Sequence, residues 1–215
     1  IEKSKDDKFS YTGLIRCTSQ ENALFPKTVR FFVYSDKYRD GIRKNAILVT
    51  CPNIKEPIPL FILFRALGIE SDKEILSYIL YDINNKSNKQ LLKFLRHSII
   101  DSNTIYTQKD AINFISNHVE YKNSDNTKFI LSNDLFPNVG KNFIDKAYFL
   151  GYLINKLIKV ELNIEKATNK DNYLYKRVDL SGFLISNLFR DLYNKLRNNI
   201  RDELDKQYLY GNWKE

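Results

Sequence analysis

The first fifty residues carry three short runs that are rich in aromatic and β-branched side chains. These runs are "FSYTGLIRCTS" (9–19), "KTVRFFVYS" (27–35) and "AILVTCP" (46–52). Runs of this composition between turn residues predict β-strands. The Asp40-Gly41 pair between the second and third runs predicts a hairpin turn. We therefore expect a small antiparallel sheet at the start of the chain.

The hydrophobic period changes to that of helices after residue 56. Pro57 and Pro59 precede an apolar run that closes at Gly68, which predicts a short buried helix. Ser71 and Glu74 have the spacing of a capping box and predict a helix to about Tyr81. Its inward positions are the apolar ones, Ile75, Leu76, Ile79 and Leu80.

Two further helices follow in the middle of the chain. The stretch "NKQLLKFLRHSII" (88–100) repeats the apolar spacing, and Thr107 with Asp110 opens another helix in the manner of a capping box. The polar stretch "EYKNSDNTK" (120–128) is expected to be a connector. Pro137 and Gly140 mark a break, and we place a subdomain boundary there.

Two long helices are expected in the last third. In residues 146–162 the apolar side chains fall at steps of three and four, the pattern of an amphipathic helix. From Leu180 to Leu204 a leucine or isoleucine recurs every four residues, which predicts a long helix with one packed seam. The expected fold class is α+β, dominated by helices, with a small N-terminal antiparallel sheet followed by two long helices.

Composition adds a few limits. The apolar fraction is 43%, and the longest apolar run, 58–64, is too short to span a bilayer, so we expect no membrane partner. Cys17 and Cys51 are too few for a disulfide framework and are expected to be buried thiols of an intracellular protein. The absence of methionine suggests a part of a longer polypeptide.

The net charge of +8 favours an acidic partner such as nucleic acid. The excess is shared equally between residues 1–140 and 141–215, so the chain has no basic tail. A group of cations near the predicted hairpin turn could touch phosphates, although a solvated hairpin explains it more simply. This group consists of Lys37, Arg39, Arg43 and Lys44.

Motifs of catalysis are lacking in the sequence. The seven glycines form no dinucleotide or phosphate-loop pattern, and His97 and His118 lack zinc-type partners at ligand spacing. The acidic stretch 201–206 has the character of a solvated helix face with intrahelical ion pairs such as Asp202 to Lys206. We therefore predict no catalytic and no metal-binding residue, and no cofactor on this chain.

The stretch "DNYLYKRVDLSG" (171–182) is the strongest candidate for a binding site. It is a short connection between the two long helices, so the directions of its cationic side chains are restricted. Lys176 and Arg177 are predicted to contact nucleic-acid phosphates, with Lys170 as a weaker candidate. Asp179 is predicted to cap the helix that follows. The alternative is that the cations are merely solvated.

Four stretches, in this order, resemble the second-largest (beta-type) subunit of multisubunit DNA-directed RNA polymerases. They are "EPIPLFILFRALGIESDKEILSYILYD" (56–82), "KAYFLGYLINKLI" (146–158), "DNYLYKRVDLSGFLISNLFRDLY" (171–193) and "GNW" (211–213). The resemblance covers most of the chain. One departure is that the segment ahead of Gly211 is shorter here than in the family, which leaves the register of that region open.

The resemblance implies a location within the subunit. Residues 1–140 would be a lobe-like domain, 141–162 the helix that returns through the protrusion, and 163–215 the start of the fork. Residues 165–177 would resemble the first fork loop, which borders the RNA–DNA hybrid. The expected partners are the largest subunit, other polymerase subunits, template DNA, the RNA–DNA hybrid and transcription factors.

The resemblance also implies chemistry that lies elsewhere. Magnesium would serve the whole enzyme from the largest subunit, so this chain alone would carry no catalytic centre. The AT-rich residue usage suggests a large DNA virus, with a protist as the alternative. The protein is expected to be intracellular, in the nucleus or the cytoplasm, or in a viral factory or virion. Two alternative functions stay open at this point, a free-standing nucleic-acid-binding module and a protein-interaction scaffold.

Overall fold

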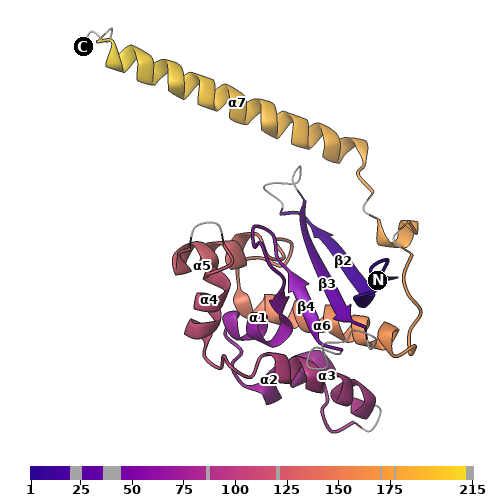
Figure 1. Ribbon diagram of the computed structural model, residues 1–215. Coiled ribbons are helices and arrows are strands. Elements are labelled where there is room, and N and C mark those ends of the chain that lie inside the picture. Colours follow the sequence, from indigo (N-terminus) through magenta and orange to yellow (C-terminus); the bar gives the residue numbers. More distant parts are fainter. Residues whose placement is uncertain are drawn as a thin grey trace. The chain divides into compact units, whose positions relative to one another are not determined.

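The computed structural model describes residues 1–19, 26–35, 45–85, 88–119, 122–169, 171–176 and 178–211. The chain forms two compact units, residues 1–170 and residues 171–215. The first contains a sheet and six helices of the described chain, and the second contains a short 3₁₀ turn and one long helix (Figure 1). The fold is α+β with helices dominating, as the sequence predicts.

The sheet of the first unit has five antiparallel strands in sequence order. Three of them match the predicted runs, and two short strands at the edges were not predicted. The strands are β1 (Glu2–Lys3), β2 (Phe9–Cys17), β3 (Lys27–Tyr34), β4 (Ile47–Thr50) and β5 (Ile58–Pro59). The predicted turn at Asp40-Gly41 lies outside the described residues.

The helices agree with the predicted segments except in one place. They are α1 (Leu60–Ala66), α2 (Asp72–Leu80), α3 (Lys89–Asp101), α4 (Gln108–Ser116), α5 (Ser124–Asn133), α6 (Phe143–Glu161) and α7 (Ser181–Leu209). None of the described helices is both long enough and apolar enough to cross a membrane.

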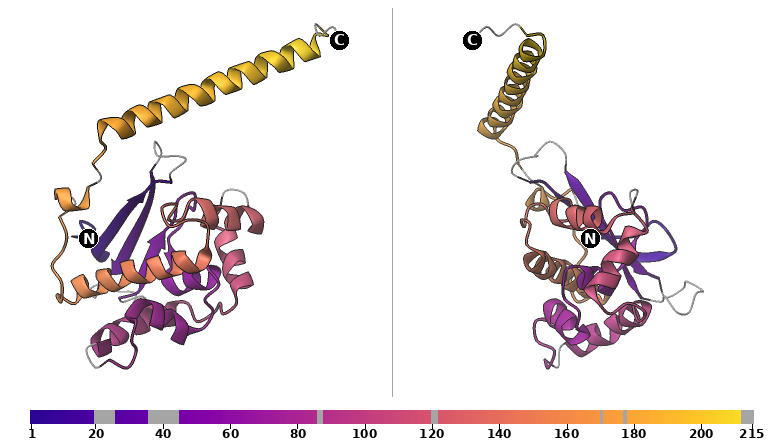
Figure 2. Two further views of the ribbon diagram at one scale, coloured as in Figure 1. Left: turned by 180° about the vertical axis from the view of Figure 1, so that it is seen from behind. Right: turned by 90° about the vertical axis from the view of Figure 1, so that its left-hand side faces the viewer.

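Helices cover one face of the sheet. Helix α6 passes behind the strands in Figure 1 and lies in front of them in the reverse view of Figure 2. The inward residues of β2, β3 and β4, such as Phe31 and Val49, belong to the same buried cluster as the apolar side chains of α1 and α6. Both cysteines are buried free thiols, as predicted. Burial raises the pKa of Cys51 to about 12, so this thiol is unreactive at neutral pH.

The start of helix α1 is set by the two prolines. Pro59 holds the N-cap position with φ −57°, and every residue of the helix is buried. Gly68 ends this segment with φ +97°, a backbone region that glycine adopts without steric cost. The prediction of a short buried helix that closes at Gly68 is confirmed.

Two predicted capping boxes have different outcomes. At α4, the Asp110 N–H donates to Thr107 Oγ1 at 3.2 Å, and the Thr107 hydroxyl donates to Asp110 Oδ2 at 2.7 Å. At α2, Ser71 is in the N-cap position, but its side chain accepts no capping hydrogen bond. The spacing located both helix starts, but a side-chain capping bond forms only at α4.

The prediction of a polar connector over 120–128 is wrong, because helix α5 begins at Ser124. The Asn123 side chain accepts a hydrogen bond from the Asp125 N–H at 3.0 Å and caps this helix. Thr127, Ile130 and Leu131 are buried on its inner face. Their spacing of three and four is helical, but the polar residues before them conceal it.

The crossing of α2 and α6 depends on a glycine. A Cβ atom on Gly151 would lie 2.4 Å from the Tyr78 carbonyl oxygen, so no side chain fits there. One turn later, the buried Asn155 side chain donates to the Ile79 carbonyl oxygen at 2.8 Å. The close approach and this hydrogen bond fix the register of the two helices.

Helix α1 carries a fully buried arginine. Arg65 Nη1 donates to the carbonyl oxygens of Ser102, at 2.7 Å, and Ile105, and Nη2 forms an ion pair with Asp72 Oδ1 at 2.5 Å. Its guanidinium also lies 5.1 Å from the centre of the Tyr106 ring. Arg65 therefore joins α1, the start of α2 and the loop after α3.

The first compact unit continues past residue 140, so the subdomain boundary predicted there stays a prediction about the interior of this unit. Helix α6 packs against α2, α3 and β2, and its residues Ala147, Leu150 and Ile154 are fully buried there. The division between the two compact units falls after residue 170.

Candidate nucleic-acid interface

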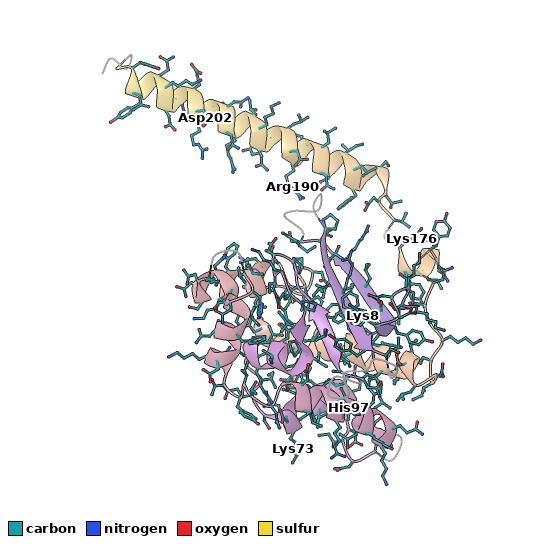
Figure 3. The ribbon with its side chains drawn as sticks, viewed as in Figure 1. Lys8, Lys73, His97, Lys176, Arg190 and Asp202 are labelled. Atoms are coloured by element: carbon teal, nitrogen blue, oxygen red, sulfur yellow. The ribbon has the colours of Figure 1, made fainter. Side chains whose placement is uncertain are left out.

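The candidate site is the turn that precedes α7 in the second unit. Figure 3 labels Lys176 on this turn. Of the predicted phosphate contacts, Lys176 is described, whereas Lys170 and Arg177 lie outside the described residues. The hairpin cations Lys37, Arg39, Arg43 and Lys44 lie outside them as well.

A short 3₁₀ turn (Tyr173–Tyr175) shapes this segment. The Asn172 side chain accepts a hydrogen bond from the Leu174 N–H at 3.1 Å, and the Tyr175 N–H donates to the Asn172 carbonyl at 3.0 Å. Asparagine favours such turns because its short side chain satisfies the first free N–H group. The turn leaves the aromatic residues exposed, with 83% of Tyr173 and 62% of Tyr175 accessible to solvent.

Lys176 is held by two neighbours on the same turn. Its ammonium lies 3.6 Å from Asp171 Oδ1 and 5.9 Å from the centre of the Tyr173 ring. An exposed ion pair of this length contributes little stability, and a cation over a ring contributes somewhat more when water is excluded. The ammonium is thus given a preferred direction while it stays accessible to an anion.

The helix start differs by one residue from the prediction. Helix α7 begins at Ser181, and Leu180 holds the N-cap position with an extended backbone and no side-chain capping bond. Asp179, the predicted cap, therefore stands one residue before the observed N-cap position. Its carboxylate remains next to the positive end of the helix dipole, which is the favourable end for a negative charge.

The predicted seam of α7 is present but not packed within this unit. No residue of α7 is buried, and the seam consists of side chains with 48% to 60% exposure: Leu184, Leu188, Leu192, Leu196, Ile200 and Leu204. A step of four residues advances about 40° beyond a full helical turn, so the seam winds around the helix. A helix with this much exposed apolar surface is typical of a part that packs in a larger assembly.

No metal site is found on the described residues: no group of three or more His, Cys, Asp or Glu is placed to hold an ion. In the acidic stretch of α7, Lys206 pairs with Glu203 at 3.7 Å instead of with the predicted Asp202. His118 Nδ1 lies 3.2 Å from Glu56 Oε2, which links the end of α4 to the loop before β5. These two contacts are ion pairs at the protein surface.

The first unit also has a surface hollow that the sequence did not indicate. Its volume is about 400 Å³, and α5 forms one side of it. The lining residues are Asn53, Ile54, Lys55, Val119, Asn126, Phe129, Ile130 and Asp134. An isolated bridge between Ile54 and Val119 brings the two sides together, a long-range contact without a local pattern in the sequence.

Comparison with known protein families shows to which family the chain belongs. A profile of the family described as RNA polymerase Rpb2, domain 2, matches residues 37–179. The chain belongs to this family. The matched stretch includes the helices α1 to α6 and the turn with Lys176, and it ends just before α7. The resemblance seen in the sequence is thereby confirmed at the level of the family.

Curated relatives from three different sources agree with this affiliation. The chain is 31% identical over 217 residues to the DNA-directed RNA polymerase II subunit 2 of Arabidopsis thaliana, covering 96% of the chain and 18% of that protein. It is 35% identical over 205 residues to subunit RPB2 of Encephalitozoon cuniculi, covering 91% and 17%. It is 31% identical over 186 residues to the DNA-directed RNA polymerase subunit 2 of Acanthamoeba polyphaga mimivirus, covering 73% and 15%. The chain therefore spans less than a fifth of the length of these relatives.

Proposed function

We propose that the chain is part of the second-largest subunit of a DNA-directed RNA polymerase and contributes to template-directed RNA synthesis. The observation that carries this proposal is the family match over 37–179, together with relatives that are named as subunits of such polymerases. The expected partners are the largest subunit and the other polymerase subunits. The exposed seam of α7 supports this view, because a free-standing protein would leave it in water.

Within the assembly, residues 1–140 would form a lobe-like part of the DNA cleft wall, and residues 165–177 would border the RNA–DNA hybrid. Lys176 supports this placement, since its ammonium is exposed and directed by Asp171 and Tyr173. Lys170 and Arg177 are proposed as further phosphate contacts on the grounds of sequence alone. Because Lys176 carries a compact charge, it would bind the backbone of either strand without reading its sequence.

As the family resemblance implies, the catalytic magnesium of the assembled enzyme would be held by the largest subunit. The chain's own part in the reaction would then be to line the cleft and to hold the hybrid. Docking of transcription factors on the outer surface and an origin in a large DNA virus are further parts of the proposal. The mimivirus relative supports the viral origin, whereas the relative from Arabidopsis thaliana has the same identity over a larger share of the chain, 96% against 73%.

The experiment that tests the function is isolation of the native gene product. The protein is tagged in its source organism and purified gently, and the mass of the complex is measured together with RNA synthesis on a DNA template. A large assembly that extends RNA in a template-dependent manner is the expected result. A small species without RNA synthesis would contradict the proposal and would favour the binding-module or scaffold alternatives.

A further inference from the structure

The sheet of the first unit has a second face, on the side away from α6, where Tyr34 and Leu48 belong to a small buried cluster while Leu14 stays exposed. A Cβ atom on Gly13 would meet Phe31 at 3.3 Å and Leu157 of α6 at 3.8 Å, so Gly13 faces the helices. Side chains alternate between the two faces of a strand, so Leu14 faces the other way. We call this second side the outer face.

The register of the strands places two arginines next to Leu14 on the outer face. Arg30 of β3 lies directly opposite Leu14 of β2, and Arg16 lies opposite Thr28 in the next pair on the same face. Arg16 and Arg30 are therefore diagonal neighbours, roughly 7–8 Å apart between Cα atoms in a regular sheet. Thr50 of β4 lies opposite Arg30 and extends the same row.

The outer face has unbalanced positive charge around this row. Arg16 and Arg30 are exposed, and neither forms an ion pair in the part of the chain that the structure describes. On the described strands the one acidic residue that faces this side is Glu2, which lies opposite Thr12. Two neighbouring guanidinium groups without a carboxylate are complementary to an anionic partner.

The apolar part of the outer face distinguishes between protein and nucleic acid. Leu14 is 48% exposed between the arginines, and contact with phosphates would not bury it. The aromatic rings on this face are not free for stacking on bases: Phe9 packs against Phe32 at 4.8 Å and against Tyr34 at 5.2 Å, and Tyr34 is only 9% exposed. Arginine is enriched at protein interfaces, and the exposed Leu14 beside the two arginines adds apolar area that a protein partner can bury.

We propose that the outer face binds a segment of a partner protein in which an apolar side chain is flanked by carboxylates. The apolar side chain would cover Leu14, and the carboxylates would each take a forked pair of hydrogen bonds from Arg16 and Arg30. Thr28 would offer a hydroxyl group at the rim, whereas the Thr50 hydroxyl is already hydrogen-bonded to the Arg30 backbone. This inference depends only on the first unit and stands whether or not the polymerase assignment is correct.

Photo-crosslinking in the native protein tests the proposal. Leu14 is replaced by p-benzoylphenylalanine in the complete polypeptide in its source cells, the complex is purified gently and irradiated, and the linked peptide is identified by mass spectrometry. The matched control is the same replacement at Ile100, which is 47% exposed on α3 and follows the exposed Arg96 by one helical turn. The crosslink at Leu14 is also measured in the double variant Arg16→Glu, Arg30→Glu. The crosslink at Ile100 is also measured in the variant Arg96→Glu.

The expected result is one dominant adduct at Leu14 with a protein segment that has two or more carboxylates within a few residues of the linked site. Its yield should fall at least fivefold with Arg16→Glu and Arg30→Glu and should fall with added salt. Thermal melting of these variants should be unchanged, because the arginines have no described ion pair to lose. The Ile100 position should give no adduct that depends on Arg96.

Four outcomes would overturn the proposal, and the first three concern the partner and the yield of the adduct. They are an adduct with nucleic acid, an adduct with a segment that lacks carboxylates, and a yield at Leu14 no higher than at Ile100. An adduct that is insensitive to the arginine reversals would also contradict it, because the charge complementarity would then play no part.

Discussion

Lys146 Nζ lies 2.8 Å from the carbonyl oxygen of Leu131, and this buried contact closes the C-terminal end of helix α5. The same ammonium donates to the carbonyl oxygens of Ser132 and Leu135, each at 2.5 Å. The last carbonyl groups of a helix have no partner within the helix, and a cation is favourable at its negative end. Lys146 of α6 therefore satisfies these groups from a neighbouring helix.

Replacement of Lys146 by methionine should destabilise the protein. Methionine retains much of the packing of the lysine stem but leaves the three carbonyl oxygens without a donor, at a cost of about 1–3 kcal/mol in the free energy of unfolding. Urea denaturation of the full chain measures this. Lys159→Met on the same helix is the control, since Lys159 is partly exposed and makes a 3.5 Å surface ion pair with Glu165. An equal loss in both variants would contradict the role given to Lys146.

The pH dependence of stability offers a second test of Lys146. Burial lowers the pKa of Lys146 from 10.5 to about 8, and Asp134 acts in the opposite direction. Between these two pH values the unfolded chain binds the proton and the folded chain does not, so this residue makes stability rise with pH. Below about pH 8 both states carry the proton and the contribution is constant.

The measurement is the difference in unfolding free energy between the natural chain and Lys146→Met from pH 7 to pH 10.5. The subtraction removes the tyrosine and cysteine groups that titrate in the same range. The difference should be flat up to about pH 8 and then increase in favour of the natural chain. A difference that decreases above pH 8 would show that the folded protein holds this proton more tightly than the unfolded chain.

Gly151→Ala should destabilise the first unit. The new methyl group would lie 2.4 Å from the Tyr78 carbonyl oxygen, a backbone atom that cannot move aside without shifting helix α2. Overpacking of this kind typically costs about 1–3 kcal/mol. Gly182→Ala is the matched control, because a Cβ atom there meets nothing within 4 Å and alanine favours the helix. Thermal melting should show a lower midpoint for Gly151→Ala alone.

The two capping sequences should respond differently to alanine. Thr107→Ala removes the acceptor for the Asp110 N–H and should cost about 1 kcal/mol of stability. Ser71→Ala removes a side chain that makes no capping bond and should cost clearly less. Chemical denaturation of the two variants measures the contrast. Equal losses would mean that the hydroxyl of Ser71 caps its helix in solution.

Lys176 should contribute to nucleic-acid contact in the assembled enzyme, if the proposed function is correct. Replacing Lys176 and Arg177 by alanine should weaken the elongation complex and reduce its salt dependence, since each lost phosphate contact lowers the logarithmic slope by roughly one. Asp171→Asn should act oppositely, because it removes the carboxylate that competes for the Lys176 ammonium. Lys195→Ala on the exposed helix α7 is the control. An unchanged salt-dependence slope in the Lys176→Ala, Arg177→Ala double variant would contradict the assignment of these residues as phosphate contacts.

The sequence by itself determined the local elements of this protein. The aromatic and β-branched runs specified β2, β3 and β4, and the pair Pro59 and Gly68 specified the bounds of the buried helix α1. The family affiliation also followed from ordered stretches of sequence. These features depend on neighbours along the chain, so a pattern of a few residues carries them.

Only the tertiary structure decided which residues from distant segments meet. The buried roles of Arg65 and Lys146, the close approach at Gly151 and the open outer face around Leu14 have no local signature. From the sequence pattern alone, a charged residue in a helix is predicted to be exposed. Arg65 and Lys146 are buried because carbonyl oxygens from distant segments accept their hydrogen bonds. The packing of helices on one face of the sheet set these environments, because it fixed which polar groups lost water and which stayed in contact with it.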